Sequence, residues 1–159
     1  MKIEIKVNVK NFNGGPKVKV AIDEEILFCE QLSKQGVKLI TIDSTKSLPC
    51  KLSIQHYGKN MKKDTKVDTH GNIVSDKALI IQSVKINEVI LTNEIFLFTF
   101  TKDDDTIIKN TNYLGYNGKF MIDINRDNLY SWYNGLQNSL VSEEETFSYD
   151  QFKKEIFGE

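Results

Sequence analysis

Residues 2–10 read Lys-Ile-Glu-Ile-Lys-Val-Asn-Val-Lys, an alternation of apolar and polar side chains with a period of two. A strand with one face on a core and the other in water produces this pattern, because successive side chains of a strand point to opposite sides of the sheet. The stretch therefore predicts a half-buried strand in an antiparallel sheet. It indicates a fold class and names no chemistry.

Further strands with turn residues between them follow along the chain. Asn13-Gly14-Gly15-Pro16 separates the first strand from the second, since Gly tolerates positive φ and Pro cannot continue a ladder. The other expected strands span 17–22, 26–30, 37–43, 51–57, 78–91 with a bend near Asn87, 94–101 as the central and most apolar strand, 106–108 and 118–125. This spacing predicts a mainly β fold, an antiparallel β-sandwich or jelly roll of about eight to ten strands with one or two short C-terminal helices.

The last third of the chain changes to a helical period. Four apolar residues have the spacing of one helix face: Leu129, Trp132, Tyr133 and Leu136. Ser148 and Gln151 form a capping box ahead of a second expected helix over 149–157. We expect a β-sandwich core over 1–125, with a helical segment over 126–159 packed on the same domain. The expected core is Ile3, Ile5, Val7, Val20, Ile54, Ile81, Phe96, Phe98, Phe100, Phe120 and Ile122.

The charge balance argues against nucleic acid as a partner. The formal net charge is −1 and Arg126 is the only arginine, whereas an interface for phosphates and bases normally uses the guanidinium fork. No apolar stretch approaches membrane-spanning length, and the N-terminal residues alternate with charge and do not resemble a signal peptide. We expect a protein made in a cytoplasm without a signal peptide, and no membrane partner.

A long polar segment, 58–77, interrupts the strands and contains the candidate metal ligands Asp64, Asp68, Asn72 and Asp76. Loops rich in oxygen ligands at the edge of a β-sandwich can hold calcium through carboxylates and carbonyls, although the spacing here matches no EF-hand. The alternative is a solvated loop whose acids pair with the lysines around them, which are Lys59, Lys62, Lys63 and Lys66. Both interpretations stay open at the level of sequence.

Aromatic residues gather with asparagines late in the chain, where Tyr113 and Tyr116 flank a Leu-Gly turn. Aromatic faces that stack on sugar rings, with amides that read hydroxyls, would suit a glycan; the same residues would also suit a protein interface or a core seam. The candidate ligand- or partner-binding residues are Tyr113, Tyr116, Asn117 and Tyr57.

Few residues of the sequence are candidates for catalysis. His56 alternates in phase with core residues of its strand, and His70 lies in a turn, so neither belongs to a nucleophile or metal motif. Cys29 and Cys50 match no metal spacing and are expected to be buried free thiols. We therefore name no catalytic residue and predict a protein that is not an enzyme.

Two blocks of the sequence form a recognisable set. The first runs through His56-Tyr57-Gly58-Lys59, Asp64-Thr65, Val67-Asp68, Gly71-Asn72-Ile73-Val74 and Asp76-Lys77-Ala78; the second is Tyr113-Leu114-Gly115-Tyr116-Asn117-Gly118-Lys119-Phe120. These blocks resemble a family of small uncharacterised proteins encoded by tailed bacteriophages of marine bacteria. Together they cover about a third of the chain. The resemblance implies a viral context, in which small β-sandwich proteins decorate capsids or build fibres and tails. A weaker similarity, of architecture alone, is to calcium-dependent carbohydrate-binding β-sandwiches.

The leading hypothesis is a non-enzymatic binding or structural protein, a virion or accessory component of a phage, which contacts protein partners or copies of itself. The alternative is a carbohydrate-binding module with calcium-assisted glycan recognition. A small enzyme is the third class, and it would need a deep pocket that joins a histidine to carboxylates.

Overall fold

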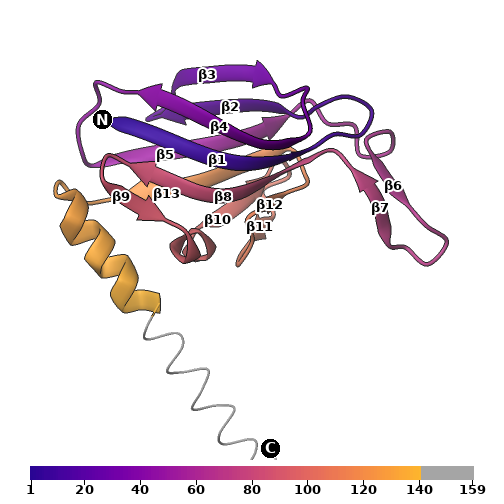
Figure 1. Ribbon diagram of the computed structural model, residues 1–159. Helices are drawn as coiled ribbons and strands as arrows, with labels where there is room; N and C mark the ends of the chain where they lie inside the picture. Colours follow the sequence, from indigo (N-terminus) through magenta and orange to yellow (C-terminus); the bar gives the residue numbers. More distant parts are fainter. Residues whose placement is uncertain (141–159) are drawn as a thin grey trace, which may run out of the picture.

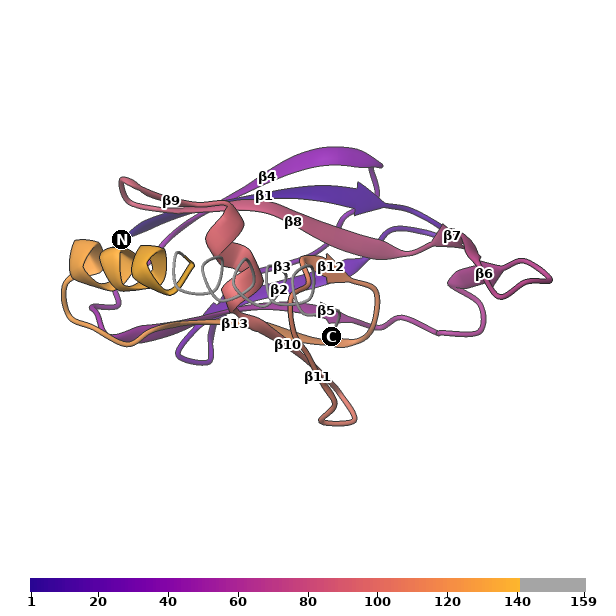
Figure 2. The same cartoon turned by 90° about the horizontal axis from the view of Figure 1, so that it is seen from below.

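The computed structural model describes residues 1–140 and contains an antiparallel β-sandwich. Its two layers lie one above the other in Figure 2, with β4, β1 and β8 in one layer and β2, β5, β13 and β10 in the other. The five-stranded sheet has the order β12 (Tyr113–Leu114), β8 (Ala78–Ile86), β1 (Lys2–Lys10), β4 (Gly36–Asp43), with β9 (Val89–Leu91) also paired to β8. The six-stranded sheet has the order β11 (Ile107–Ile108), β10 (Thr99–Lys102), β13 (Gly118–Ile124), β5 (Cys50–Tyr57), β2 (Lys17–Ile22), β3 (Glu25–Gln31).

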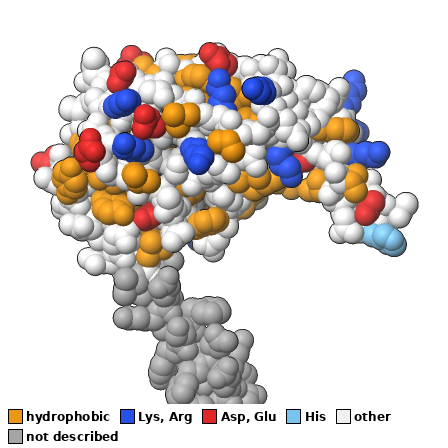
Figure 3. Space-filling view, viewed as in Figure 1, with side chains coloured by type: hydrophobic (Ala, Val, Ile, Leu, Met, Phe, Trp, Pro, Cys, Tyr) orange, Lys and Arg blue, Asp and Glu red, His pale blue; other side chains and the backbone are white. Residues whose placement is uncertain are grey.

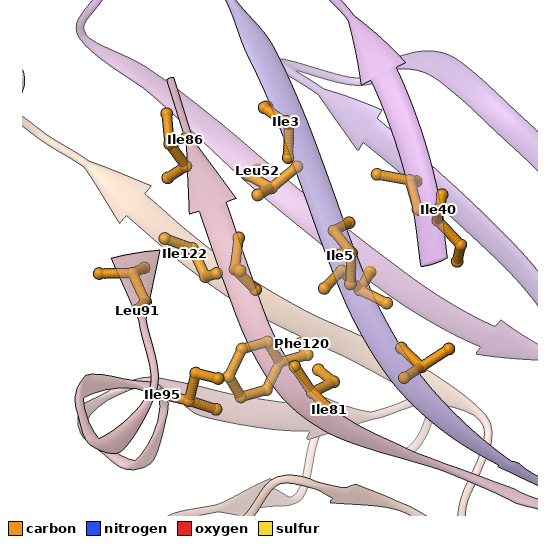
Figure 4. Packing of buried hydrophobic residues seen from close by; sticks show 14 of the residues in the cluster. Ile3, Ile5, Ile40, Leu52, Ile81, Ile86, Leu91, Ile95, Phe120 and Ile122 are labelled. Carbon is orange, nitrogen blue, oxygen red and sulfur yellow. The ribbon is translucent and has the colours of Figure 1, made fainter. Parts of the chain in front are cut away.

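The alternation in β1 directs its odd-numbered side chains into the core, as the sequence predicts. Ile3, Ile5, Val7 and Val9 are fully buried between the sheets. Figure 4 shows the side chains of Ile3 and Ile5 close to Leu52 of the opposite sheet. Removal of this apolar surface from water is the main force that holds the two layers together. The predicted core residues that are buried are Ile3, Ile5, Val7, Val20, Ile54, Ile81, Phe100, Phe120 and Ile122.

The prediction of a central strand over 94–101 is wrong for most of its length. Asn93–Leu97 forms a 3₁₀ helix, and only Thr99–Lys102 continues as a strand. Phe96 is 41% exposed and Phe98 is half-buried, so neither belongs to the fully buried core as expected. Residues 95–98 are all apolar, and a short run without polar positions fits a buried strand and a short helical turn equally well.

The helix of residues 129–140 lies at one end of the sandwich, and its start agrees with the predicted helical stripe. Leu129 and Trp132 are buried, and the Trp132 ring stacks on Phe98 with 6.1 Å between the ring centroids. The second expected helix, over 149–157, lies outside the described residues. Cys50 is buried as expected, whereas Cys29 is exposed, and both are free thiols.

The polar segment contains a small hairpin, β6 (Thr65–Val67) and β7 (Ile73–Asp76), that forms a separate two-stranded sheet. This hairpin extends beyond the sandwich at the end opposite the helix (Figures 1 and 2). Lysines, acids and apolar side chains are interspersed on the face seen in Figure 3. No helix within residues 1–140 is long and apolar enough to cross a membrane.

Candidate functional site

A buried ion pair lies where the β6–β7 hairpin meets the sandwich. The Lys59 Nζ is 2.5 Å from Asp76 Oδ1 and donates a second hydrogen bond of 2.5 Å to the Gly115 carbonyl. The two charged side chains are 0% and 2% exposed. A buried charge is tolerated only when its hydrogen bonds are made, and this ammonium joins two segments that are far apart in the sequence.

Asp76 accepts two further hydrogen bonds. Thr65 Oγ1 donates to Oδ1 over 2.7 Å, and the Tyr113 hydroxyl donates to Oδ2. Burial acts to raise the pKa of Asp76, but the hydrogen bonds from Lys59, Tyr113 and Thr65 outweigh it and hold this pKa below its usual range. Burial and the neighbouring carboxylate raise the pKa of Tyr113. Tyr113 therefore anchors the hairpin through Asp76, and its hydroxyl is not free for a ligand.

A second lysine neutralises Asp64. Lys77 Nζ lies 3.2 Å from Asp64 Oδ2, which also accepts the Asn60 backbone N–H over 2.8 Å, while Asn13 Nδ2 donates to Oδ1 over 2.8 Å. Burial acts to raise the pKa of Asp64, and the hydrogen bonds from Asn60, Asn13 and Lys77 together lower it. Both carboxylates at the base of the hairpin are thus ionised and matched with a cation from this chain.

Asn117 positions the turn that follows β12. Its Nδ2 donates to the Lys59 carbonyl, and its Oδ1 accepts the Lys59 N–H, each over 2.8 Å. Gly115 is required in this turn, because a Cβ there would lie 2.7 Å from Tyr113 Cε1. The Asn117 side chain therefore ties its own turn to the backbone of Lys59, and this fixes the position of the neighbouring residue Tyr116.

Of the four candidate ligand- or partner-binding residues, Tyr116 is the one that keeps a substantial exposed surface, at 40%. The Lys102 Nζ lies 4.2 Å from its ring centroid, close enough for a cation–π contact. The ring borders a hollow of about 280 Å³. We call this the Tyr116 hollow, and its lining residues are Met61, Lys102, Asp103, Asp104, Tyr116 and Asn117.

The four candidate metal ligands fall into two groups at opposite ends of the hairpin. Asp68 and Asn72 are exposed near the tip, where Asp68 Oδ1 accepts the backbone N–H groups of His70 and Asn72, each over 2.9 Å. Asp64 and Asp76 lie at the base, where their oxygens are bonded to lysines and other donors. Within residues 1–140, no group of three or more His, Cys, Asp or Glu side chains is placed to hold a metal ion. The four residues therefore do not fit one calcium ion held between them.

The remaining candidate, Tyr57, lies on β5 next to His56. His56 is fully buried, as the sequence predicts for a core histidine, and its Nδ1 lies 2.9 Å from the Leu114 carbonyl. Its Nε2 has no hydrogen-bond partner among residues 1–140. Burial lowers the pKa of His56 to about 4. Tyr57 is half-buried on the outer face of its sheet. Its ring centroid lies 4.3 Å from Lys19 Nζ, and its hydroxyl lies 3.3 Å from Cys29 Sγ. It lies outside the Tyr116 hollow.

The structure therefore brings Tyr113, Asn117 and Asp76 together around Lys59 and leaves Tyr116 beside them as the accessible group. Sequence reasoning missed the structural role of Lys59 and the contribution of Lys102 and Met61 to the hollow. The sequence analysis did propose that the loop acids pair with nearby lysines, and Lys59 was among them. It did not distinguish Lys59 from the other lysines, and it did not include Lys77.

The comparisons with known proteins agree with this architecture. No protein-family model matches the chain, and no curated protein sequence does. The structure is similar to vCBM60 in complex with galactobiose, with a TM-score of 0.54 and 12% identity over 77% of this chain and 98% of that one. It is also similar to a selenomethionine form of vCBM60, with a TM-score of 0.52 and 11% identity over 77% of this chain and 89% of that one. The second structure is described with a circular permutation that links two families of calcium-dependent carbohydrate binding modules. The chain shares the β-sandwich fold of these carbohydrate-binding modules.

Proposed function

We propose that this protein binds a carbohydrate at the Tyr116 hollow. The observation that carries the proposal is an exposed tyrosine beside a hollow, on a fold similar to that of a module solved with galactobiose. The apolar face of a sugar ring packs well on an aromatic ring, and its hydroxyls need donors and acceptors close by. The comparisons favour this hypothesis over the phage structural role, for which they offer no support.

The residues around the ring supply those partners. Lys102 is a donor, while the carboxylates of Asp103 and Asp104 are acceptors at the same hollow. Asn117 holds the turn through the Lys59 backbone, so the position of Tyr116 is set before a ligand arrives. A preorganised site loses less conformational entropy when it binds.

The proposed activity is binding without bond cleavage. A glycosidase needs one carboxyl group with a raised pKa as its general acid. Hydrogen bonds from Thr106 to Asp104 lower the pKa of that carboxyl, and Lys102 lowers it further. The carboxylates of Asp64 and Asp76 are likewise held ionised. These groups would not deliver a proton to a leaving sugar at neutral pH.

The proposed binding does not use calcium held by Asp64 and Asp76. The modules linked with vCBM60 are calcium-dependent, but in this chain both of those carboxylates are bonded to lysine ammonium groups. Binding in EDTA and binding in millimolar calcium are therefore expected to be equal.

Calorimetric titration tests the proposal. The full chain is first screened on an array of neutral and acidic glycans, with galactobiose included, and the best ligand is titrated into wild-type protein, Tyr116→Ala and Tyr130→Ala. Tyr130 is 59% exposed on the helix and outside the hollow, so it is a matched control. We expect Tyr116→Ala to lose at least about tenfold in affinity and the control to bind normally. Absence of any carbohydrate ligand, or equal affinities for all three proteins, would contradict the proposal.

A second candidate function is self-association through the β6–β7 hairpin. The observation that favours it is three exposed apolar residues on this protruding hairpin: Val67, Ile73 and Val74 are 54–58% exposed. Exposed apolar surface on an extended hairpin suits a contact with another copy of the chain. Light scattering of wild-type protein and of Val74→Lys tests this. We expect the wild type to form a dimer and the variant to be a monomer. A wild type that is monomeric at all concentrations would contradict self-association.

A further inference from the structure

The outer face of the six-stranded sheet carries a hollow that results from two small residues. Ala21 on β2 lies directly opposite Ser53 on β5, and both alternate with side chains that point into the core. The adjacent row of the same face holds Lys19, Gln55 and Lys119, which pair across the same strands. These long side chains stand beside a floor of small ones, and the hollow between them measures about 350 Å³.

This hollow continues toward Tyr116 through a second one. The second hollow, of about 370 Å³, shares Lys119 and Met121 with the first. It shares Lys102 and Asp103 with the Tyr116 hollow. The three hollows therefore adjoin one another through shared lining residues, and we call them together the sheet groove. It runs across the strands from β3 to β10, and four strand spacings give it a length of roughly 19 Å.

The charges along the sheet groove are mixed. Its cations are Lys19, Lys51, Lys102 and Lys119, and its anions are Asp23, Glu24, Asp103, Asp104 and Asp105. A strongly anionic or cationic polymer would meet like charges along the whole path, which costs binding energy. A neutral polymer rich in hydroxyls would find donors and acceptors throughout, with apolar contacts from Ile26 and Met121.

We infer that the sheet groove binds an extended chain of neutral sugars, one end of which lies on Tyr116. This inference rests on the proposed carbohydrate binding and adds to it the form of the ligand, an internal stretch of a neutral polysaccharide. A terminal sugar would use the Tyr116 hollow alone. A chain would also contact Lys119, Gln55 and the floor at Ser53, so affinity should rise with chain length.

The test is a titration of the full chain with a series of neutral oligosaccharides from disaccharide to hexasaccharide. The series has the sugar and linkage of the best ligand on the glycan array. Three proteins are compared: wild type, Ser53→Tyr and Ser83→Tyr. Tyrosine suits a strand position, and at Ser53 it fills the floor of the groove. Ser83 lies on β8 of the other sheet, opposite the exposed Lys6. Ser83→Tyr is therefore the control, because it makes the same substitution on the outer face that lacks the groove. Thermal melts establish that each variant is folded.

For wild type and Ser83→Tyr we expect affinity to increase about tenfold from disaccharide to tetrasaccharide. For Ser53→Tyr we expect disaccharide affinity to stay at the wild-type value and the gain with length to disappear. An anionic series such as oligogalacturonate should bind less tightly than the neutral one. If sugars bind with the same affinity at every length, and Ser53→Tyr behaves as wild type, the groove inference is overturned while carbohydrate binding stands. If no sugar of any length binds, the proposed function falls, and this inference falls with it.

Discussion

The ammonium group of Lys59 lies 2.5 Å from a carboxylate oxygen of Asp76, and both side chains are removed from water. The same ammonium donates to the Gly115 carbonyl, one residue before Tyr116 in the chain. This pair therefore connects the base of the hairpin to the turn that presents the exposed tyrosine.

Replacement of Lys59 by Met is expected to destabilise the protein strongly, because it leaves the Asp76 carboxylate buried without its cation. Loss of one partner of a buried pair costs about 3–5 kcal/mol. The measurement is the free energy of unfolding in urea. Lys85→Met is the control, since Lys85 Nζ is 3.9 Å from Glu4 Oε2 and 40% exposed, and such surface pairs contribute less than about 1 kcal/mol. Equal losses in the two variants would contradict the role given to Lys59.

The two neighbouring tyrosines are expected to separate stability from binding. Tyr113→Phe removes a hydrogen bond to a charged group and should lower the free energy of unfolding by about 2 kcal/mol, with glycan affinity unchanged. Tyr116→Ala should do the opposite and reduce affinity with little effect on stability. Urea unfolding and calorimetry on both variants check this, and a loss of affinity in Tyr113→Phe alone would reverse the assignment.

The free energy of unfolding is expected to decrease as the pH is lowered, because His56 is buried in its neutral form. Its pKa of about 4 in the folded protein is below the ordinary value of 6.5, so the unfolded chain takes up the proton first as pH decreases. The contribution is fully present above pH 6.5 and is lost progressively down to about pH 4, by at most about 3 kcal/mol.

Unfolding in urea at a series of pH values measures this loss in wild type and in His56→Gln. The variant should show a smaller fall between pH 6.5 and 4. A fall of the same size in both proteins would assign the effect to other groups. Below about pH 4, protonation of Asp64 and Asp76, whose pKa values are lowered, should remove stability in both proteins alike.

Calcium is expected to leave the melting temperature unchanged. A ligand that binds only the native state must raise its stability, but the carboxylates at the hairpin base already have lysine partners. A thermal melt of EDTA-treated protein, with and without millimolar calcium and with magnesium as the comparison, should show shifts of less than about 1 °C. A calcium-specific rise of several degrees would establish a metal site in this chain.

The sequence predicted the sandwich well because its strands have one polar face. The alternation of β1 and the turn at Asn87, which has a φ of 50°, place the first strand and the end of β8 correctly. The strand prediction was wrong around Phe96 because residues 95–98 are all apolar and define no period. Phe98, directly after the 3₁₀ helix, stacks on Trp132, which is distant in the sequence.

The candidate site could be predicted only in part. The Leu-Gly turn between them pointed to both Tyr113 and Tyr116 as binding residues, but in the structure Tyr113 donates a hydrogen bond to Asp76 and Tyr116 is exposed. Spacing alone does not show which of two nearby tyrosines faces a buried carboxylate. Charge composition gave no signal that Lys59 is buried, because its burial depends on Gly115 and Asp76 meeting in space.

The measurement that tests carbohydrate binding most directly is a map of backbone amide chemical shifts in the labelled full chain, recorded with and without the glycan selected on the array. Binding at the Tyr116 hollow should shift the amides of Met61, Lys102, Asp103 and Tyr116 and leave the opposite sheet around Lys6 and Thr41 unchanged. Absence of shifts with any glycan, or shifts confined to the opposite sheet, would contradict it.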